Sequence, residues 1–435
     1  MTEKASLSIS QFLQRVKYQI RSKEAQIFVE RELQHHIEQR KRECILEGYS
    51  EEEAERVTIE QMGNPTILGK EMHIIHKPKI DWFLIGVFAL LIILGTVPFY
   101  FLSVEFSEMF FSKKVAFSLM AVVVVVMFMF YDYRKISNIW HWLFGIALLL
   151  SILIHFSNHT MNGVSYLNVG FFSINSWLVS VIYVISFVGM ISKLHRETKK
   201  LWVFTLVMFL LPNYFFFTNP TLILTVFYSL TLLIVMAFSP IAKDQLKRMF
   251  LIKGVFSVSA LLVLWINIRP HQYERLLGFI DPSSYPTTYG YFPIQLNLIL
   301  NESKFFGKVT SSEVMKVLPT LDFDQDLIFV SLVAHLGWLF GIILLATFGL
   351  FLIRIVYISH QTSDPLGVML VLASVSIIGL AAVWNIMMVF GLMPLTGTPL
   401  PFISYGGQFQ LIYAGLIGLI LSVYRRKDLV QMQSI

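Results

Sequence analysis

Ten apolar segments, each close to the length of a membrane-spanning helix, constrain this chain more than any other feature of its sequence. A helix needs about 20 apolar residues to cross the hydrocarbon core of a bilayer. The segments lie at about residues 82–103, 115–131, 139–156, 175–192, 201–217, 221–238, 250–267, 327–353, 366–390 and 408–424. The sequence therefore predicts an all-α, polytopic membrane protein with about ten transmembrane helices.

The charged residues are concentrated at the N-terminus. Across the 435 residues, 55% are hydrophobic and only 14% are charged, whereas soluble domains carry about 25% charged residues. Residues 1–80 hold 26 of the 62 charges. We expect a small helical cytoplasmic domain over residues 1–80 and a membrane domain over residues 81–435.

The composition excludes a secreted enzyme, and the single Cys44 excludes a disulfide framework and a Cys-built zinc site. The basic pI does not indicate nucleic-acid binding.

Local signals predict three helices in the N-terminal domain, at about residues 24–47, 51–62 and 66–76. Ser50 followed by Glu53 is a capping-box pattern. Asn64-Pro65 marks the next break. The stretch that contains "EGYSEEEAERVTIEQMGNP" resembles the prefix domain that precedes some bacterial permeases. That resemblance implies a partner-binding or regulatory module, with a cytoplasmic partner that the sequence does not identify.

The basic residues of the membrane domain predict which side of the membrane each loop faces. Cytoplasmic loops are enriched in Lys and Arg, and long loops count little in this rule. The loops after the even-numbered segments carry Arg134, Lys135, Lys193, Arg196, Lys199, Lys200, Lys243, Lys247, Arg248, Arg354, Arg425, Arg426 and Lys427. The short loops on the opposite side hold only Lys113 and Lys114. We therefore expect both termini to be cytoplasmic.

One long loop, at about residues 268–325, is predicted on the extracytoplasmic side. Loops of this length are usually functional or disordered. This loop is rich in aromatic residues and prolines and contains an apolar run at residues 294–300. We expect an ordered element that lies against the outer face of the membrane.

Acidic residues cluster where this loop enters the eighth segment. Asp322, Asp324 and Asp326 stand there, and His335 follows within the segment. Ionisable groups in membrane helices are rare and usually functional. The cluster could supply a general base or bind a divalent cation. It could equally be a solvated loop end, with Asp326 as a helix N-cap.

A second candidate site is the loop "GLMPLTGTPLPFISYGG" at residues 391–407. Its four glycines and three prolines in 17 residues cannot continue a helix. Irregular backbone near membrane depth is tolerated only where it is buried in protein or lines a cavity. The loop therefore either lines a site or forms a rigid re-entrant turn.

This glycine–proline loop resembles a signature of the SEDS family, the FtsW/RodA/SpoVE-like proteins that polymerise peptidoglycan. The family pattern reads approximately GLLPVTGVPLPLVSYGGSS. This chain matches it at Gly391, Leu392, Pro394, Thr396, Gly397, Pro399, Leu400, Pro401, Ser404, Tyr405, Gly406 and Gly407. "RPHQYERLLGFIDP", "YGYFPIQLNLILNESKFFGKV" and "LPTLDFDQDLIFVSLVAHLGWLFG" also resemble family segments, in the same order. In the last of these, Asp326 falls on the family's catalytic Asp. The resemblance covers residues 81–427.

The resemblance implies a peptidoglycan glycosyltransferase of the bacterial cytoplasmic membrane that polymerises lipid II at the outer face. It implies Asp326 as the general base, with Mg²⁺ or Mn²⁺ at Asp324 and Asp326 as a further expectation. A single-pass class B penicillin-binding transpeptidase is the implied partner. The implied substrate-binding residues are Arg275, Gln295, Lys308, Pro401, Ser404, Tyr405, Gly406 and Gly407.

The chain departs from the family pattern at several polar positions. "INSWLVSV" stands where the family has Gln-Pro-Ser-Glu and then a Lys, and Thr221 replaces an Asp. His335 occupies the position of one of two paired Glu residues. Two residues are inserted before Asp326, which makes Asp324 a second candidate for the base. A non-catalytic lipid II-binding scaffold and a flippase for the lipid-linked precursor are therefore alternative functions.

Overall fold

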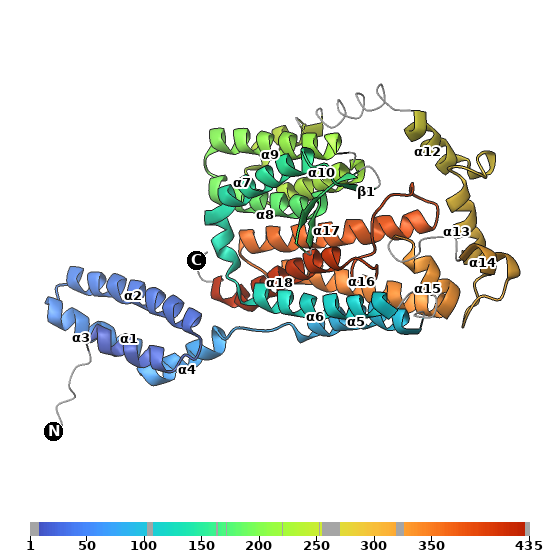
Figure 1. The fold of residues 1–435 in the computed structure, drawn as a ribbon. Coiled ribbons are helices and arrows are strands. Elements are labelled where there is room, and N and C mark those ends of the chain that lie inside the picture. Colours follow the sequence, from blue (N-terminus) through green and yellow to red (C-terminus); the bar gives the residue numbers. More distant parts are fainter. Residues whose placement is uncertain are drawn as a thin grey trace. The chain divides into compact units, whose positions relative to one another are not determined.

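The computed structural model describes residues 8–101, 108–161, 164–170, 172–219, 221–251, 253–254, 270–318 and 326–430. The chain divides into two compact units. One comprises Met1–Ile80 together with Tyr424–Ile435, and the other comprises Asp81–Val423 (Figure 1). We describe each unit by itself.

The first unit is built on four helices: α1 (Ile9–Tyr18), α2 (Lys23–Leu46), α3 (Glu51–Met62) and α4 (Pro65–Ile75). The three predicted helices are confirmed within a residue or two, whereas α1 was not predicted individually. Phe12 and Val16 of α1 and Val29 and Ile37 of α2 belong to one apolar core of the unit. This core explains why helices with so many charges fold together, because each buries an apolar stripe.

The predicted capping box at the start of α3 is present. The amide of Glu53 donates to Ser50 Oγ at 3.3 Å, and the amide of Ser50 donates to Glu53 Oε2 at 3.2 Å. The hydrogen bond from the Ser50 hydroxyl lowers the pKa of Glu53 below its ordinary value. Two otherwise unpaired amides at the helix start are thereby satisfied.

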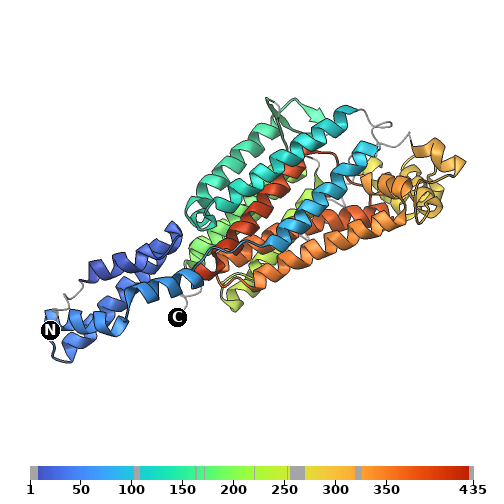
Figure 2. The same cartoon turned by 90° about the horizontal axis from the view of Figure 1, so that it is seen from below.

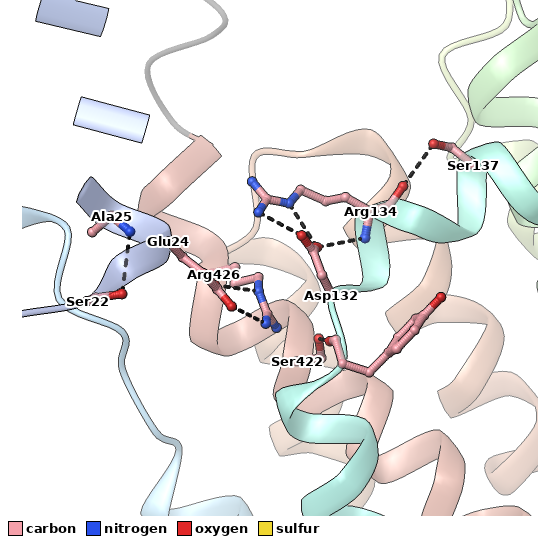
Figure 3. A network of polar contacts seen from close by, with 9 residues as sticks. Ser22, Glu24, Ala25, Asp132, Arg134, Ser137, Ser422 and Arg426 are labelled. Carbon is pink, nitrogen blue, oxygen red and sulfur yellow. Dashed lines mark hydrogen bonds and ion pairs between the residues drawn. The ribbon is translucent and has the colours of Figure 1, made fainter. Parts of the chain in front are cut away.

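The C-terminal turns of the chain supply the first unit with two ion pairs. The guanidinium of Arg426 donates from Nε and Nη2 to the two carboxylate oxygens of Glu24, at 2.9 and 2.8 Å (Figure 3). Lys79 Nζ lies 2.7 Å from Asp428 Oδ2. Residues more than 300 positions apart are therefore joined within this unit.

The second unit is a bundle of long apolar helices. They are α5 (Trp82–Phe101), α6 (Glu108–Phe130), α7 (Ile136–His155), α8 (Ser176–Leu194), α9 (Thr198–Thr218), α10 (Leu222–Ala237), α16 (Trp338–His360), α17 (Pro365–Val389) and α18 (Gly407–Val430). The last turns of α18, from Tyr424 onwards, belong to the first unit. In the described part of the chain, eight helices are long and apolar enough to cross a membrane, and α10 is a shorter apolar helix. The chain is thus a multi-pass membrane protein.

Helices α8, α17 and α18 are the most buried helices of this bundle. Of the apolar stretch of each, 67%, 72% and 67% is buried, against 17% for the stretch that contains α7. Helix α8 packs against α7, α9 and α17, and α17 also packs against α10 and α16. The peripheral helices expose large apolar side chains such as Val123 and Ile353, as lipid contact requires.

Two predicted spans have different outcomes. The seventh, at 250–267, lies almost entirely outside the described residues. The eighth, predicted as one helix over 327–353, is wrong as a single span. It consists of α15 (Ile328–Leu336) and α16, which meet at Gly337. Gly337 has a φ of 91°, a left-handed conformation that ends the first helix.

The segment at residues 270–318 is ordered and helical, as expected. It contains α12 (Pro270–Ile280), a short 3₁₀ turn η2 (Pro282–Ser284), α13 (Tyr291–Glu302) and α14 (Ser312–Val317). These elements lie together at one end of the bundle, where α13 packs against α15 (Figures 1 and 2). The apolar run at residues 294–300 supplies the buried face of α13 through Leu296 and Ile299.

Two small hairpins between α7 and α8 were not predicted. Strands β1 (Thr160–Met161) and β2 (Val164–Ser165) pair antiparallel, as do β3 (Leu167–Val169) and β4 (Phe172–Ile174). Strands of two or three residues are too short to show an alternating pattern in the sequence.

Candidate functional site

The structure brings Asp326 to the glycine–proline loop. A Cβ atom added at Gly397 of that loop would lie 3.6 Å from Asp326 Oδ2. The N-cap residue of α15 is Leu327, and it makes no side-chain cap. Asp326 is therefore not the helix cap that one interpretation of the sequence suggested, and its carboxylate instead lies beside the loop.

Asn385 links the backbone of Asp326 to the loop. This asparagine is fully buried in α17, and its amide nitrogen donates to the carbonyls of Asp326 and Thr398, each at 2.7 Å. Because the amide group carries two protons, one side chain holds both segments. The position of Asp326 relative to the loop is thus set by the most buried helix of the bundle.

Hydroxyl groups hold the first arm of the loop, residues 394–398. Trp384 Nε1 donates to Thr396 Oγ1 at 2.9 Å, and the hydroxyls of Thr396 and Thr398 lie 3.0 Å apart. Thr398 is fully buried. These bonds satisfy polar groups that the bundle removes from water, as buried irregular backbone requires.

The second arm, residues 399–407, leads into α18. Pro401 is buried, and Ser404 is buried with its hydroxyl accepting a hydrogen bond from the amide of Leu400 at 2.8 Å. Tyr405, Gly406 and Gly407 are half-buried, and the Tyr405 ring lies 6.4 Å from that of Phe99. The loop is a largely buried, hydrogen-bonded segment, and Asp326 lies beside its first arm.

Lys114 is a residue of this region that the sequence did not reveal. Its predicted place was a short loop, but it lies in α6 and is 1% exposed. Its ammonium donates to three carbonyls of the second arm. The available signal was its place directly before an apolar run, with Ser118 one helical turn later.

The other predicted site residues lie in or beside the 270–318 segment. Arg275 on α12 and Lys308 after α13 are exposed, and Gln295 on α13 is half-buried. Gly307 and Val309, on either side of Lys308, donate backbone hydrogen bonds to Leu336 and Ala334, at 3.2 and 2.8 Å. Lys308 is thereby held near the end of α15 opposite to Asp326.

A neutral polar network lies beside the two stretches in which the chain departs from the family pattern, residues 174–181 and 219–223. The side chain of Asn219 accepts from the amide of Ser165 at 2.8 Å and donates to the Ser165 carbonyl at 3.2 Å. It also donates to Ser176 Oγ at 2.9 Å. Asn175 caps α8 by accepting from the amides of Trp177 and Leu178. Uncharged hydrogen bonds thus tie the β1–β2 hairpin to the start of α8.

The metal prediction stays a prediction, because the structure does not describe all of its residues. Asp322 and Asp324 lie outside the described residues. Within the described residues, no group of three His, Cys, Asp or Glu side chains comes together. His335, the other ionisable residue of this region, is buried in the last turn of α15, where its Nδ1 lies 2.8 Å from the Ser331 carbonyl.

Known proteins resemble this chain in sequence. Residues 79–429 match the FtsW/RodA/SpoVE family model, described as cell cycle protein. A probable peptidoglycan glycosyltransferase FtsW from Saccharophagus degradans is 29% identical over 185 residues, which are 40% of this chain and 46% of the relative. Stage V sporulation protein E from Bacillus subtilis is 28% identical over 176 residues, 40% and 48% of the two chains. The chain spans about half the length of these curated relatives.

Solved structures share the fold. A chain from a peptidoglycan synthase complex superposes with a TM-score of 0.65 and 19% identity, covering 80% of this chain and 98% of that chain. The rod shape determining protein RodA from Thermus thermophilus gives a TM-score of 0.58 and 17% identity, with 80% and 97% covered. Since the family model matches most of the sequence, the chain belongs to the FtsW/RodA/SpoVE family.

Proposed function

We propose that this protein is a peptidoglycan glycosyltransferase that polymerises lipid II at the outer face of the bacterial cytoplasmic membrane, with Asp326 as the general base. The relatives whose names state an activity are peptidoglycan glycosyltransferases. The observation that carries the proposal is the placement of the Asp326 carboxylate against Gly397. The one described carboxylate of the predicted acidic cluster thus lies at the loop that matches the family signature.

The chemistry needs a proton acceptor at the attacking hydroxyl. A sugar hydroxyl of the acceptor attacks the anomeric carbon of the donor, the bond to the polyprenyl pyrophosphate breaks, and the hydroxyl proton passes to a base. Asp326 is the base in this proposal, because its carboxylate stands at a segment of irregular backbone rather than in a solvated loop. The half-buried Tyr405, Gly406 and Gly407 and the buried Pro401 and Ser404 would shape the surface next to it.

The departing pyrophosphate needs positive charge. Arg275 and Lys308 are our candidates, because both are exposed cations in the segment at this end of the bundle. Gln295, half-buried on α13, would add a polar contact. A divalent cation held by Asp324 and Asp326 is a further part of the proposal; of that pair, the structure describes Asp326.

The orientation and partner belong to the same proposal. Basic loops on one side and the 270–318 segment on the other favour cytoplasmic termini and an extracytoplasmic site. The structural neighbour comes from a peptidoglycan synthase complex. A single-pass class B penicillin-binding transpeptidase is therefore the partner that we propose.

A non-catalytic lipid II-binding scaffold is a second candidate. The observation that favours it is the neutral network of Asn219, Ser176 and Ser165, which lies beside stretches where the family pattern carries charged groups that this chain lacks. A scaffold would keep its role in cells without the Asp326 carboxylate. A polymerase would lose its role when this carboxylate is removed.

Polymerisation of labelled lipid II by the purified full chain tests the first proposal. Asp326→Asn keeps the size of the side chain and removes the base, so we expect a loss of about 100-fold or more in rate. Glu313→Gln, an exposed carboxylate on α14, serves as the matched control and should leave the rate unchanged. Equal rates for Asp326→Asn and the parent would exclude Asp326 as the base. Complementation by Asp326→Asn in cells would then favour the scaffold.

A further inference from the structure

The ammonium of Lys114 is bound entirely by the backbone of one turn. Lys114 Nζ donates to the carbonyls of Phe402, Ile403 and Ser404 at 2.8, 3.1 and 2.8 Å. A lysine ammonium carries three protons and no acceptor, so its donor capacity is filled by three consecutive carbonyls. The Phe99 ring lies 5.9 Å from the same nitrogen. In the described part of the chain, no carboxylate pairs with Lys114.

The turn that Lys114 binds has an unusual backbone. Phe402 has a φ of 67°, and it is the one described non-glycine residue with a positive φ. This conformation is unfavourable for a bulky side chain and persists only where its surroundings impose it. The amide of Ser404 donates to the Leu400 carbonyl at 3.0 Å, which closes the turn. Three carbonyls of a strained turn thereby face one cation.

Helices on several sides hold this turn. The Phe402 ring packs against Phe88, Phe351 and Tyr413, with centroids 5.3, 5.8 and 5.8 Å away. On α5, a Cβ atom at Gly95 would lie 2.6 Å from the Phe402 carbonyl oxygen. Only glycine therefore permits this close approach of α5 to the turn.

A second polar link fixes α6 against α18. Ser118 Oγ donates to the Lys114 carbonyl at 2.8 Å, and Gln410 Nε2 donates to Ser118 Oγ at 2.9 Å. Gln410 lies in the first turn of α18, shortly after the turn that Lys114 binds. Lys114 and Ser118 thus hold both sides of the junction between the loop and the last helix.

We infer that Lys114 is a positioning residue for the glycosyl transfer proposed above, and that it acts by fixing the second arm of the loop whose first arm lies beside Asp326. This inference rests on the proposed function. Lys114 does not supply the charge for the pyrophosphate, because its protons are all donated to carbonyls and its side chain is 1% exposed. Its role is to make one conformation of residues 400–405 stable enough to shape the site.

Replacement of Lys114 by methionine tests the inference in the purified full chain. Lys114→Met keeps an unbranched side chain of similar length and leaves three buried carbonyls without a donor, which is strongly unfavourable. We expect hydrogen exchange in peptides covering residues 398–406 to quicken about tenfold or more, with α8 and α17 unchanged. We expect kcat for lipid II polymerisation to fall about tenfold or more, with KM within about threefold. Lys113→Met, at the exposed neighbouring position, is the control and should match the parent in both.

Lys114→Arg separates positioning from a general structural role. Arginine keeps the charge and several donors, so it should restore part of the kcat and of the exchange protection. Should Lys114→Met not fold, Lys114→Gln, which retains two amide protons, is measured with the same expectations. The inference would be overturned if Lys114→Met, or Lys114→Gln in its place, showed the kcat of the parent and the parent's hydrogen exchange at residues 398–406. A parent without polymerase activity would defeat the proposed function alone, because the exchange measurement would still decide whether Lys114 fixes the turn.

Discussion

Asn385 is the single side chain on which the geometry of the site most depends. Its two amide protons bridge the carbonyls of Asp326 and Thr398, so a residue of α17 sets the spacing between the carboxylate-bearing segment and the loop. Neither carbonyl belongs to a regular helix, and each therefore needs a partner from outside its own segment.

We predict that Asn385→Asp destabilises the protein. The aspartate has no donor for the two carbonyls and would place its own oxygens against them, and each buried group left unpaired costs about 1–3 kcal/mol. The thermal unfolding midpoint of the purified protein should fall by several degrees. Asn168→Asp, at an exposed position on β3, should change it little. An unchanged midpoint for Asn385→Asp would show that the bridge contributes nothing.

At the residue scale, the sequence identified the motifs, but it did not reveal a tertiary contact. The loop signature and the acidic cluster were identified separately, and the structure brings Asp326 to the loop. The contact between Lys114 and the carbonyls of residues 402–404 joins positions 288 to 290 apart in the chain. No local pattern encodes such a contact, so the lysine was assigned to a loop by its charge.

At the scale of elements, the break at Gly337 is the feature that hydropathy could not reveal. Residues 327–353 are apolar throughout, and a glycine within such a run does not interrupt the hydropathy pattern. In the structure, the amides of Trp338 and Leu339 donate to the carbonyls of Lys304 and Phe305, at 3.0 and 3.1 Å. The segment after α13 thus satisfies the free amides at the start of α16. The conformation of Gly337 and these two hydrogen bonds both place the start of a new helix at this point.

We predict that Gly337→Ala disrupts this junction. A Cβ atom there would lie 2.6 Å from the Phe305 carbonyl oxygen and 2.8 Å from Phe306 Cα, and the φ of 91° disfavours any side chain. Hydrogen exchange at residues 304–309 should quicken, and the unfolding midpoint should fall. Gly349→Ala, inside α16 with open space at the Cβ position, should be neutral or slightly stabilising because alanine favours helix. If both variants behaved alike, the junction would not depend on the glycine.

At the scale of the whole molecule, the segregation of charge predicted a helical N-terminal part, and three of its helices were placed correctly. The sequence did not indicate that the chain from Tyr424 onwards groups with that part. The reason is physical: Glu24 and Arg426 are 402 positions apart, and an ion pair between such distant residues produces no periodic pattern in the sequence. Figure 3 shows the guanidinium of Arg426 directed at both oxygens of Glu24.

This pair yields a prediction for the first unit. The side chain of Arg426 is fully buried, whereas that of Glu24 is 36% exposed. Removing the charged acceptor of a buried guanidinium is costly, since one charged partner no longer offsets the desolvation of the cation. Glu24→Gln should therefore quicken hydrogen exchange in the last turns of α18 and at the start of α2. Glu30→Gln is the control: it breaks the pair with Lys17, in which both side chains are more than a third exposed, and pairs of that kind contribute about 0–1 kcal/mol. Equal exchange in the two variants would mean that burial of Arg426 adds nothing to its ion pair.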